Sequence, residues 1–263
     1  MPSINQSNWN VSYYWAQGSG LQLGNCDYKG TRVLWNASVP FAYVNYVGNS
    51  SGPFTDELQS TSAQITVRQI MQGFDLKVSY DIYGADYLYD HVWRFHDDGQ
   101  FGSMIVIGGP GEEIDGHHTY HLPFRFDLDI SGSSGDSVQR WTRLGTAGFW
   151  SDVSQEGRLL PSVPQGAHYD WQVIDKATNR RAMMRAGELG QAEVWALAYS
   201  SAEAWGAWGG AQPSAPGSAG SVPAIYATGE SVQNSDVVLW YIAHVSSRDL
   251  IAACGPWLKL VGF

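Results

Sequence analysis

Residues 124–130 read FRFDLDI, and their apolar and polar side chains alternate one by one. Successive side chains of a β-strand point to opposite faces of a sheet, so this pattern predicts a strand with one apolar face. Similar strand-like text fills residues 21–47, 65–84, 92–109, 236–250 and 254–263. Turn signals such as Asp98-Gly99 separate these runs, as β-hairpins require. The chain is therefore built mainly of strands, and only residues 155–162 and 180–193 allow short helices.

The composition indicates how these strands are buried. Aromatic residues make up 13% of the 263-residue chain, charged residues only 15%, and 30 residues are glycine. This balance is typical of an all-β protein with many turns. No internal repeat or linker interrupts the sequence, and a chain of this length can enclose one sizeable core. We therefore expect a single domain over residues 1–263 with an all-β fold, a large twisted antiparallel β-sandwich.

The formal net charge of −10 limits the partners of the chain. Nucleic acids and anionic membranes bind basic patches, so neither is expected as the main partner. No apolar run approaches the ~20 residues of a transmembrane helix, and the first residues lack the features of a signal peptide. We expect a cytoplasmic protein that binds a small molecule. The two cysteines, Cys26 and Cys254, fit either a disulfide or two buried thiols.

Three of the seven histidines lie within five positions, at His117, His118 and His121, where a loop leads into a strand. Imidazole suits copper, zinc, iron or nickel. The cluster therefore predicts either a metal site or a polar patch at the beginning of the strand. A further ligand has to come from a distant part of the chain, and His244 in the apolar run LWYIAHV is the best candidate. A lone histidine in an apolar strand is also compatible with an ordinary core residue.

The segments around these histidines resemble the C-terminal catalytic β-sandwich of the copper amine oxidases. FRFDLDISG is similar to the segment that follows the His-x-His copper ligands of that family, and DVVLWYIAHVSSRDL is similar to the strand before its third copper histidine. IYGADYLYDHVWRFHDDG aligns without a gap with the family's T-x-x-N-Y motif and the strand after it. VLWNASVPFAYVNYVG resembles a family segment farther upstream. The resemblance covers residues 21–132 and 236–263.

This resemblance implies a copper-dependent oxidoreductase that acts on a small, amine-containing molecule. Tyr87 takes the position of the tyrosine that the family converts into the quinone cofactor topaquinone. Tyr46 takes the position of a tyrosine that is hydrogen-bonded to the quinone, and Asp56 stands in for the catalytic base. The family is dimeric, which suggests a homodimer. The implied copper ligands are His118, His121 and His244.

The histidine pair aligns with the family motif in more than one way. Counting back from FRFDLD without a gap gives His118 and Tyr120, whereas one deletion gives His121 with His118 or His117 as its partner. These alternatives stay open at the level of sequence. His91, outside the cluster, flanks a strand and is expected at the surface.

Two other function classes fit the same sequence. Asp86 and Leu88 flank Tyr87 where the family has an asparagine and an acidic residue, so Tyr87 is also compatible with an unmodified tyrosine. The scaffold would then serve a quinone-free metalloenzyme that oxidises or cyclises a small molecule in specialised metabolism. Trp205 and Trp208, in a Gly-rich loop, would instead suit a non-catalytic binding module.

Overall fold

The computed structural model describes the chain in separate stretches. These are residues 1–16, 20–46, 54–58, 64–82, 87–108, 118–130, 132–144, 147–159, 168–187, 191–201, 203, 223–246 and 253–263. All regular secondary-structure elements in these stretches are β-strands, and they form two ten-stranded antiparallel sheets. Across these stretches no helix is long and apolar enough to cross a membrane. The predicted all-β sandwich is confirmed.

The first sheet is centred on β11. Its strand order is β1-β2-β3-β4-β11-β19-β17-β14, with β5 paired to β11 and β6. β4 and β5 pair with successive parts of the same edge of β11. Pro40, which lacks an N–H donor, lies in the break between them. The strands are β1 (Ser3–Gln6), β2 (Trp9–Ala16), β3 (Gly20–Tyr28), β4 (Thr31–Ser38), β5 (Phe41–Tyr46), β6 (Phe54–Glu57), β11 (His118–Leu128), β14 (Gly157–Leu159), β17 (Gln191–Ala198) and β19 (Val237–Ser246).

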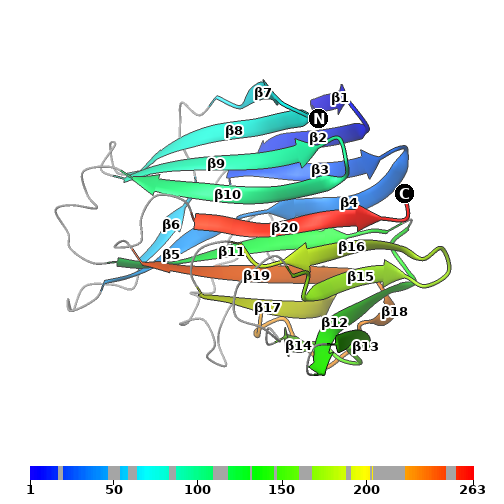
Figure 1. Ribbon diagram of the computed structural model, residues 1–263. Coiled ribbons are helices and arrows are strands. Elements are labelled where there is room, and N and C mark those ends of the chain that lie inside the picture. The colour runs from blue at the N-terminus through cyan, green and yellow to red at the C-terminus, as the bar shows by residue number, and fades with distance from the viewer. Residues whose placement is uncertain are drawn as a thin grey trace.

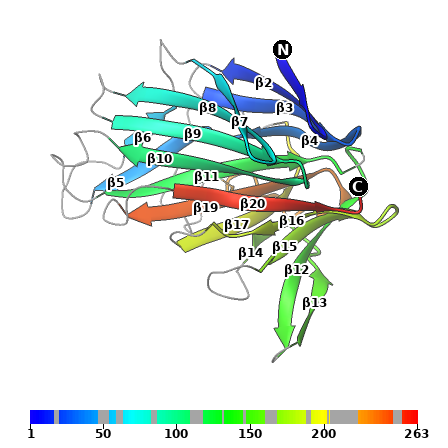
Figure 2. The same cartoon turned by 45° about the horizontal axis from the view of Figure 1, so that its top comes forward.

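The second sheet has the order β13-β12-β15-β16-β20-β10-β9-β8-β7, with β18 paired to β12. The turn at Asp98 and Gly99 joins β9 to β10, and Gly99 adopts a φ of 82° that suits glycine. Figure 2 shows the β12–β13 ribbon extending away from the rest of the sandwich. The strands are β7 (Thr66–Ile70), β8 (Gly73–Ile82), β9 (Tyr87–His96), β10 (Gln100–Gly108), β12 (Asp136–Leu144), β13 (Ala147–Asp152), β15 (Trp171–Asp175), β16 (Arg180–Arg185), β18 (Gln233–Ser235) and β20 (Ala253–Val261).

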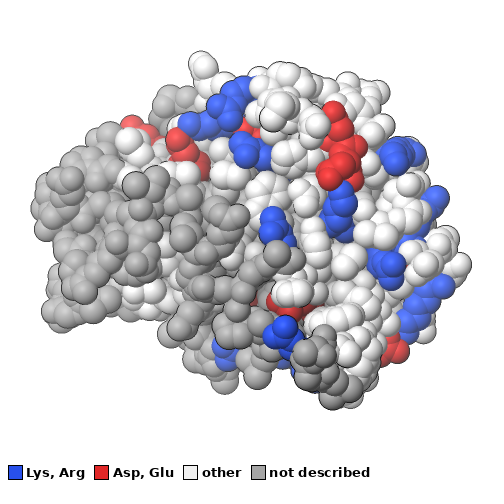
Figure 3. Space-filling model, viewed as in Figure 1, with Lys and Arg blue, Asp and Glu red and all other residues white. Residues whose placement is uncertain are grey.

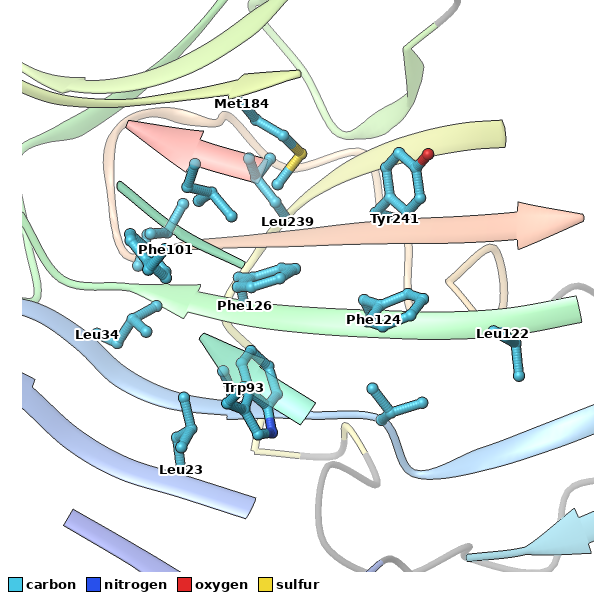
Figure 4. Packing of buried hydrophobic residues seen from close by; sticks show 14 of the residues in the cluster. Leu23, Leu34, Trp93, Phe101, Leu122, Phe124, Phe126, Met184, Leu239 and Tyr241 are labelled. Carbon is cyan, nitrogen blue, oxygen red and sulfur yellow. The ribbon is translucent and has the colours of Figure 1, made fainter. Parts of the chain in front are cut away.

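The core lies between the two sheets, which are stacked face to face (Figure 1). Trp93 of the second sheet points toward Phe126 of the first (Figure 4), and their ring centroids are 5.8 Å apart in an edge-to-face arrangement. Trp9 makes similar contacts with Phe95 and Phe101. Such aromatic pairs add stability beyond the area that they bury. This packing explains why a chain so rich in aromatic residues forms a sandwich.

The first sheet is covered on its outer face as well. A second, smaller cluster lies there and consists of Phe41, Tyr43, Leu197, Val238 and Trp240. As a result Arg125, which alternates with the core residues of β11, is fully buried. Its guanidinium pairs with Glu203, at 2.6 Å, and with Asp127, at 3.3 Å. The polar side chains of FRFDLDI are therefore not a solvent-exposed face.

The outer face of the second sheet is polar and carries charges of both signs, which lie close together in Figure 3. Asp75 receives ion pairs from Arg68, at 2.8 Å, and Arg94, at 2.7 Å. Lys77 pairs with Asp90 at 2.7 Å. Arg68 is exposed, whereas Asp75 is buried beneath the two arginines. The face is therefore polar and partly open to solvent, as alternation predicts for a sheet with one buried side.

Three details differ from or refine the sequence-based expectations. The two segments that allow short helices contain strands instead, because their side chains complete the sheets as β14, β16 and the beginning of β17. Cys26 is a buried free thiol, and burial raises its pKa. The side chain of Cys254 and the residues Trp205 and Trp208 lie outside the described part of the chain.

Candidate functional site

His121 of β11 and His244 of β19 are directly opposite each other in the first sheet. Their Nδ1 atoms are 2.7 Å apart, and their ring centroids are 4.9 Å apart. The two residues are 123 positions apart in the sequence, and the pairing of β11 with β19 brings them together. Of the three implied copper ligands, these two form a contact.

The neighbours of the pair come from β5. Asn45 Nδ2 lies 3.0 Å from His121 Nε2, and the Tyr43 ring centroid lies 5.6 Å from that of His121. With the Asn45 amide donating to Nε2, His121 carries its proton on Nδ1 and donates it to His244 Nδ1. The pair is thus a chain of two neutral imidazoles held at one end by an amide.

Both imidazoles are poor bases in this position. Burial, and then the neighbouring His244, lower the pKa of His121 to about 4. Burial, and then the Arg158 guanidinium, lower the pKa of His244 to about 4. The rings therefore stay neutral at physiological pH, and neutral imidazole is the form that binds a metal ion.

The other implied ligands are less completely defined. The backbone of His118 is in register with Tyr46, but the side chain of His118 and all of His117 lie outside the described part of the chain. Among the described residues, no group of three or more His, Cys, Asp or Glu side chains is arranged to hold a metal ion. His121 and His244 are therefore the described imidazoles that are available to an ion on this sheet.

Tyr87 and Tyr46 meet on the other side of the first sheet. Tyr87 begins β9 and Tyr46 ends β5, at the same end of the sandwich, on the left in Figure 1. Their hydroxyl oxygens are 3.3 Å apart. Asp86 lies outside the described residues, and Leu88 is exposed on the opposite face of β9.

Asp56 of β6 lies in the same interior layer and is only 5% exposed. Its Oδ2 accepts a short hydrogen bond from the hydroxyl of Tyr89. Burial raises the pKa of the Asp56 carboxyl, and the Tyr89 hydrogen bond acts in the opposite direction. The Tyr89 ring packs edge-to-face on Tyr120, with centroids 6.3 Å apart. Sequence reasoning missed Tyr89, although its spacing of two from Tyr87 places both on one face of β9.

The first sheet separates the histidine pair from the tyrosines. Tyr120 and Leu122 belong to the core between the sheets, and His121 lies between them in the strand. On β19, Ala243 and Val245 likewise point into the core on either side of His244. The imidazoles therefore lie on the outer face, next to Tyr43, and the candidate site residues divide into two groups on opposite faces.

His91 is not at the surface, as the sequence suggested, but fully buried in the core. It shares the inner face of β9 with Tyr89 and Trp93, as two-residue alternation requires. His91 Nε2 lies 2.9 Å from Ser103 Oγ, and Nδ1 lies 3.4 Å from the hydroxyl of Tyr80. Burial lowers the pKa of His91 to about 3, so this imidazole is neutral.

Comparison with known proteins gives a likeness in structure only. No family model matches the sequence, and no curated protein matches it. Solved structures with a similar fold include a lysyl oxidase from Pichia pastoris (TM-score 0.68, 12% identity), an amine oxidase from Aspergillus nidulans (0.68, 14%) and a copper-containing benzylamine oxidase from Hansenula polymorpha (0.62, 13%). Each alignment covers 99% of this chain but only 52%, 51% and 59% of the respective oxidase.

The comparison therefore establishes the fold of these oxidases over about half of their length. The chain has an amine-oxidase-like scaffold, and the low identity carries neither the activity nor the metal of those enzymes to it.

Proposed function

We propose that this protein is a copper-dependent oxidoreductase for a small, amine-containing molecule, and that it works without a quinone. The observation that carries the proposal is the contact between His121 and His244 on adjacent central strands. The amine-oxidase-like scaffold supports the same class of chemistry.

The donor set fits copper. Imidazole nitrogen is a preferred ligand of this metal. Two nitrogens that share an ion through bonds of about 2.0–2.1 Å lie about 3 Å apart. The Nδ1 atoms of His121 and His244 are 2.7 Å apart, so a small rotation of the rings admits an ion in place of the proton between them. Since both rings are neutral, the proton between them can move to Nε2 of His121, and binding releases no net proton.

The surrounding residues support this assignment. With an ion on Nδ1, His121 carries its proton on Nε2, and Asn45 holds the ring by turning its amide oxygen toward that proton. Tyr43 packs beside the His121 ring and limits its rotation. Bound copper would relay electrons from the substrate to dioxygen, and the chain's own residues would orient its ligands and exclude water.

Topaquinone does not fit this arrangement. In the family that the sequence resembles, copper and oxygen convert the tyrosine, which requires the metal and the tyrosine to share one site. Here an ion on His121 and His244 lies on the outer face of the first sheet, whereas Tyr87 lies between the sheets. Leu88 also replaces the acidic residue that follows the tyrosine in the family. We propose that Tyr87 remains an unmodified tyrosine.

The proposal is tested by loading purified protein with copper and measuring the bound metal and the uptake of dioxygen with small amines such as benzylamine. We expect one copper per chain, copper-dependent uptake of dioxygen and an unmodified mass for the peptide that contains Tyr87. His121→Ala and His244→Ala should abolish both copper binding and uptake.

His96→Ala is the matched control, because His96 is a half-buried histidine that packs on Trp257 in the second sheet. Copper binding that persists in the His121→Ala and His244→Ala variants, or a quinone at Tyr87, would refute the proposal.

A further inference from the structure

A buried cluster of phenols around one carboxyl lies between the sheets, and the proposed metal chemistry does not use it. Its members are Tyr46, Asp56, Tyr87, Tyr89 and Tyr120. Tyr89 and Tyr120 are fully buried, and Asp56 and Tyr87 are nearly so. Tyr46 is half-buried. Buried ionisable groups are costly for stability, so a concentration of them in a core indicates a function.

The cluster consists of two polar pairs. In one, the hydroxyls of Tyr46 and Tyr87 are 3.3 Å apart. In the other, the hydroxyl of Tyr89 donates to the carboxylate of Asp56. Tyr87 and Tyr89 are two residues apart on the inner face of β9. At a rise of about 3.3 Å per residue, the Cα atoms of Tyr87 and Tyr89 lie about 7 Å apart, with both side chains on the same face.

Each pair has a distinct chemical capacity. Burial raises the pKa of Asp56, which makes its carboxylate a stronger base than an exposed aspartate. Tyr89 fixes one carboxylate oxygen and so orients the other. Each hydroxyl has one proton, and two hydroxyl oxygens 3.3 Å apart can both turn that proton toward a third oxygen between them. The Tyr46–Tyr87 pair is therefore suited to stabilise a developing negative charge on oxygen.

We propose that this cluster is a redox-neutral acid–base site for a small enolisable carbonyl compound. Asp56 takes a proton from the carbon next to the carbonyl. The electron pair of the broken C–H bond forms the carbon–carbon double bond of the enolate, and the carbonyl π pair moves to oxygen, where Tyr46 and Tyr87 donate hydrogen bonds. The carboxyl proton of Asp56 exchanges with water, and Asp56 then delivers a solvent-derived proton to the same carbon. Atoms and electrons balance without any oxidant or metal.

The spacing of Tyr87 and Tyr89 along β9 suits such a substrate. A carbonyl oxygen lies about 2.7–3.0 Å from the phenol that donates to it. A carbon about to lose its proton lies about 3–3.5 Å from the base. The oxygen and this carbon are separated by only two bonds. The path from the phenol through the carbonyl oxygen and this carbon to the base therefore spans about 7 Å when it is bent. Asp56, Tyr46 and Tyr87 are the residues that touch substrate, and Tyr89 is a positioning residue.

The test measures exchange of the hydrogens next to the carbonyl of 2-tetralone, cyclohexanone and phenylacetone for deuterium in D₂O, followed by proton NMR. The intact protein should accelerate exchange well above the buffer rate for at least one of these probes. Asp56→Asn should lower the protein-dependent rate by about 100-fold or more, because a general base contributes about 10²–10⁴-fold. Asp90→Asn is the matched control, since Asp90 lies on the outer face of the same strand as Tyr89 and pairs with Lys77.

A second measurement does not depend on turnover. 2-Naphthol resembles a planar enol, and the site should bind its ionised form at a pH below the pKa of free naphthol. Tyr46→Phe and Tyr87→Phe should each weaken this binding about tenfold or more, as expected for losing a hydrogen bond to a charged group. Near-ultraviolet circular dichroism checks that each variant is folded.

This proposal is independent of the copper site, and the experiment separates the two. Exchange and naphtholate binding should survive treatment with a metal chelator. Failure of the copper proposal would leave this result unchanged. Exchange that disappears on chelation, or that is the same in Asp56→Asn as in the intact protein, would overturn the acid–base site. So would the absence of both exchange and naphtholate binding.

Discussion

Tyr120 and His121 are consecutive residues of β11, yet their side chains lie on opposite faces of the first sheet. Tyr120 packs against Tyr89 between the sheets, and His121 meets His244 on the outside. A single residue step therefore decides whether a ligand faces the tyrosine cluster or the opposite side. The proposed functions divide in the same way, between an outer imidazole pair and an inner acid–base cluster.

Asn45 provides a prediction about the metal site. Removing its amide by Asn45→Ala leaves His121 Nε2 without the partner at 3.0 Å. Loss of such an outer partner of a metal-binding histidine lowers metal affinity by about 10- to 100-fold. Competitive copper titration measures the change. Asn10→Ala, at an exposed position of β2, serves as the control, and equal affinities in all three proteins would contradict the role of Asn45.

The buried neutral imidazole of His91 should make the folded protein less stable in acid. Its folded pKa of about 3 is below the ordinary value of 6.5, so between these pH values the unfolded chain binds a proton that the folded chain does not. The stabilisation is complete above about pH 6.5 and is lost as the pH falls toward 3. In urea unfolding at pH 7 and pH 4, His91→Gln should lose less stability on acidification than the original chain. The same loss in both proteins would show that His91 is not buried in its neutral form.

The buried carboxyl of Asp136 should give the free energy of unfolding the opposite dependence on pH. Burial raises its pKa to about 8; the hydrogen bond from the Ile130 N–H acts in the opposite direction, and the charges of Asp129, Asp175 and Asp236 add smaller raising effects. The folded chain therefore holds a proton that the unfolded chain releases above about pH 4, so this contribution falls as the pH rises toward 8.

Asp136→Asn should remove this dependence, and its benefit should be larger at pH 8 than at pH 5. Unfolding in urea at both pH values measures it. Asp81→Asn, at an exposed position, is the control. A benefit that is equal at the two pH values would contradict a protonated Asp136.

The effects on stability of substituting Arg125 and Glu203 should be strongly coupled. Both side chains are fully buried, and Arg125 Nη2 lies 2.6 Å from Glu203 Oε2. Removing one partner of a buried ion pair leaves a buried charge and costs about 3–5 kcal/mol. Arg125→Met and Glu203→Gln should each destabilise the fold by about this amount, and the double variant should be less destabilised than the sum. Additive effects in urea unfolding would show that the two side chains do not interact.

The strands of the core follow from the sequence because alternation is a local property. FRFDLDI becomes part of β11, and Phe126 packs on Trp93 as an inner-face residue should. The burial of Arg125 does not follow from alternation, because Phe41, Leu197 and Trp240 come from other strands to cover the outer face. The surface position expected for His91 is wrong. His91 is two residues from both Tyr89 and Trp93, so it shares their inward face of β9, whatever its distance from the turn.

The candidate sites could be predicted only in part from the sequence, for a similar reason. The resemblance pointed to Tyr46 and Tyr87, and the structure brings their hydroxyls within 3.3 Å. The partnership of His121 with His244 depends on the register between β11 and β19, which no local pattern specifies. Asp56 and Tyr89 belong to different sheets, so only the stacking of the sheets makes them a pair.

The most direct test of the two separate sites is pulsed electron paramagnetic resonance of the copper-loaded protein, which counts the imidazole nitrogens around the metal. We predict two imidazoles in the original chain, loss of this copper signal in His244→Ala, and an unchanged spectrum in Tyr87→Phe. A spectrum that changes in Tyr87→Phe but not in His244→Ala would place the metal between the sheets and contradict the division into two sites.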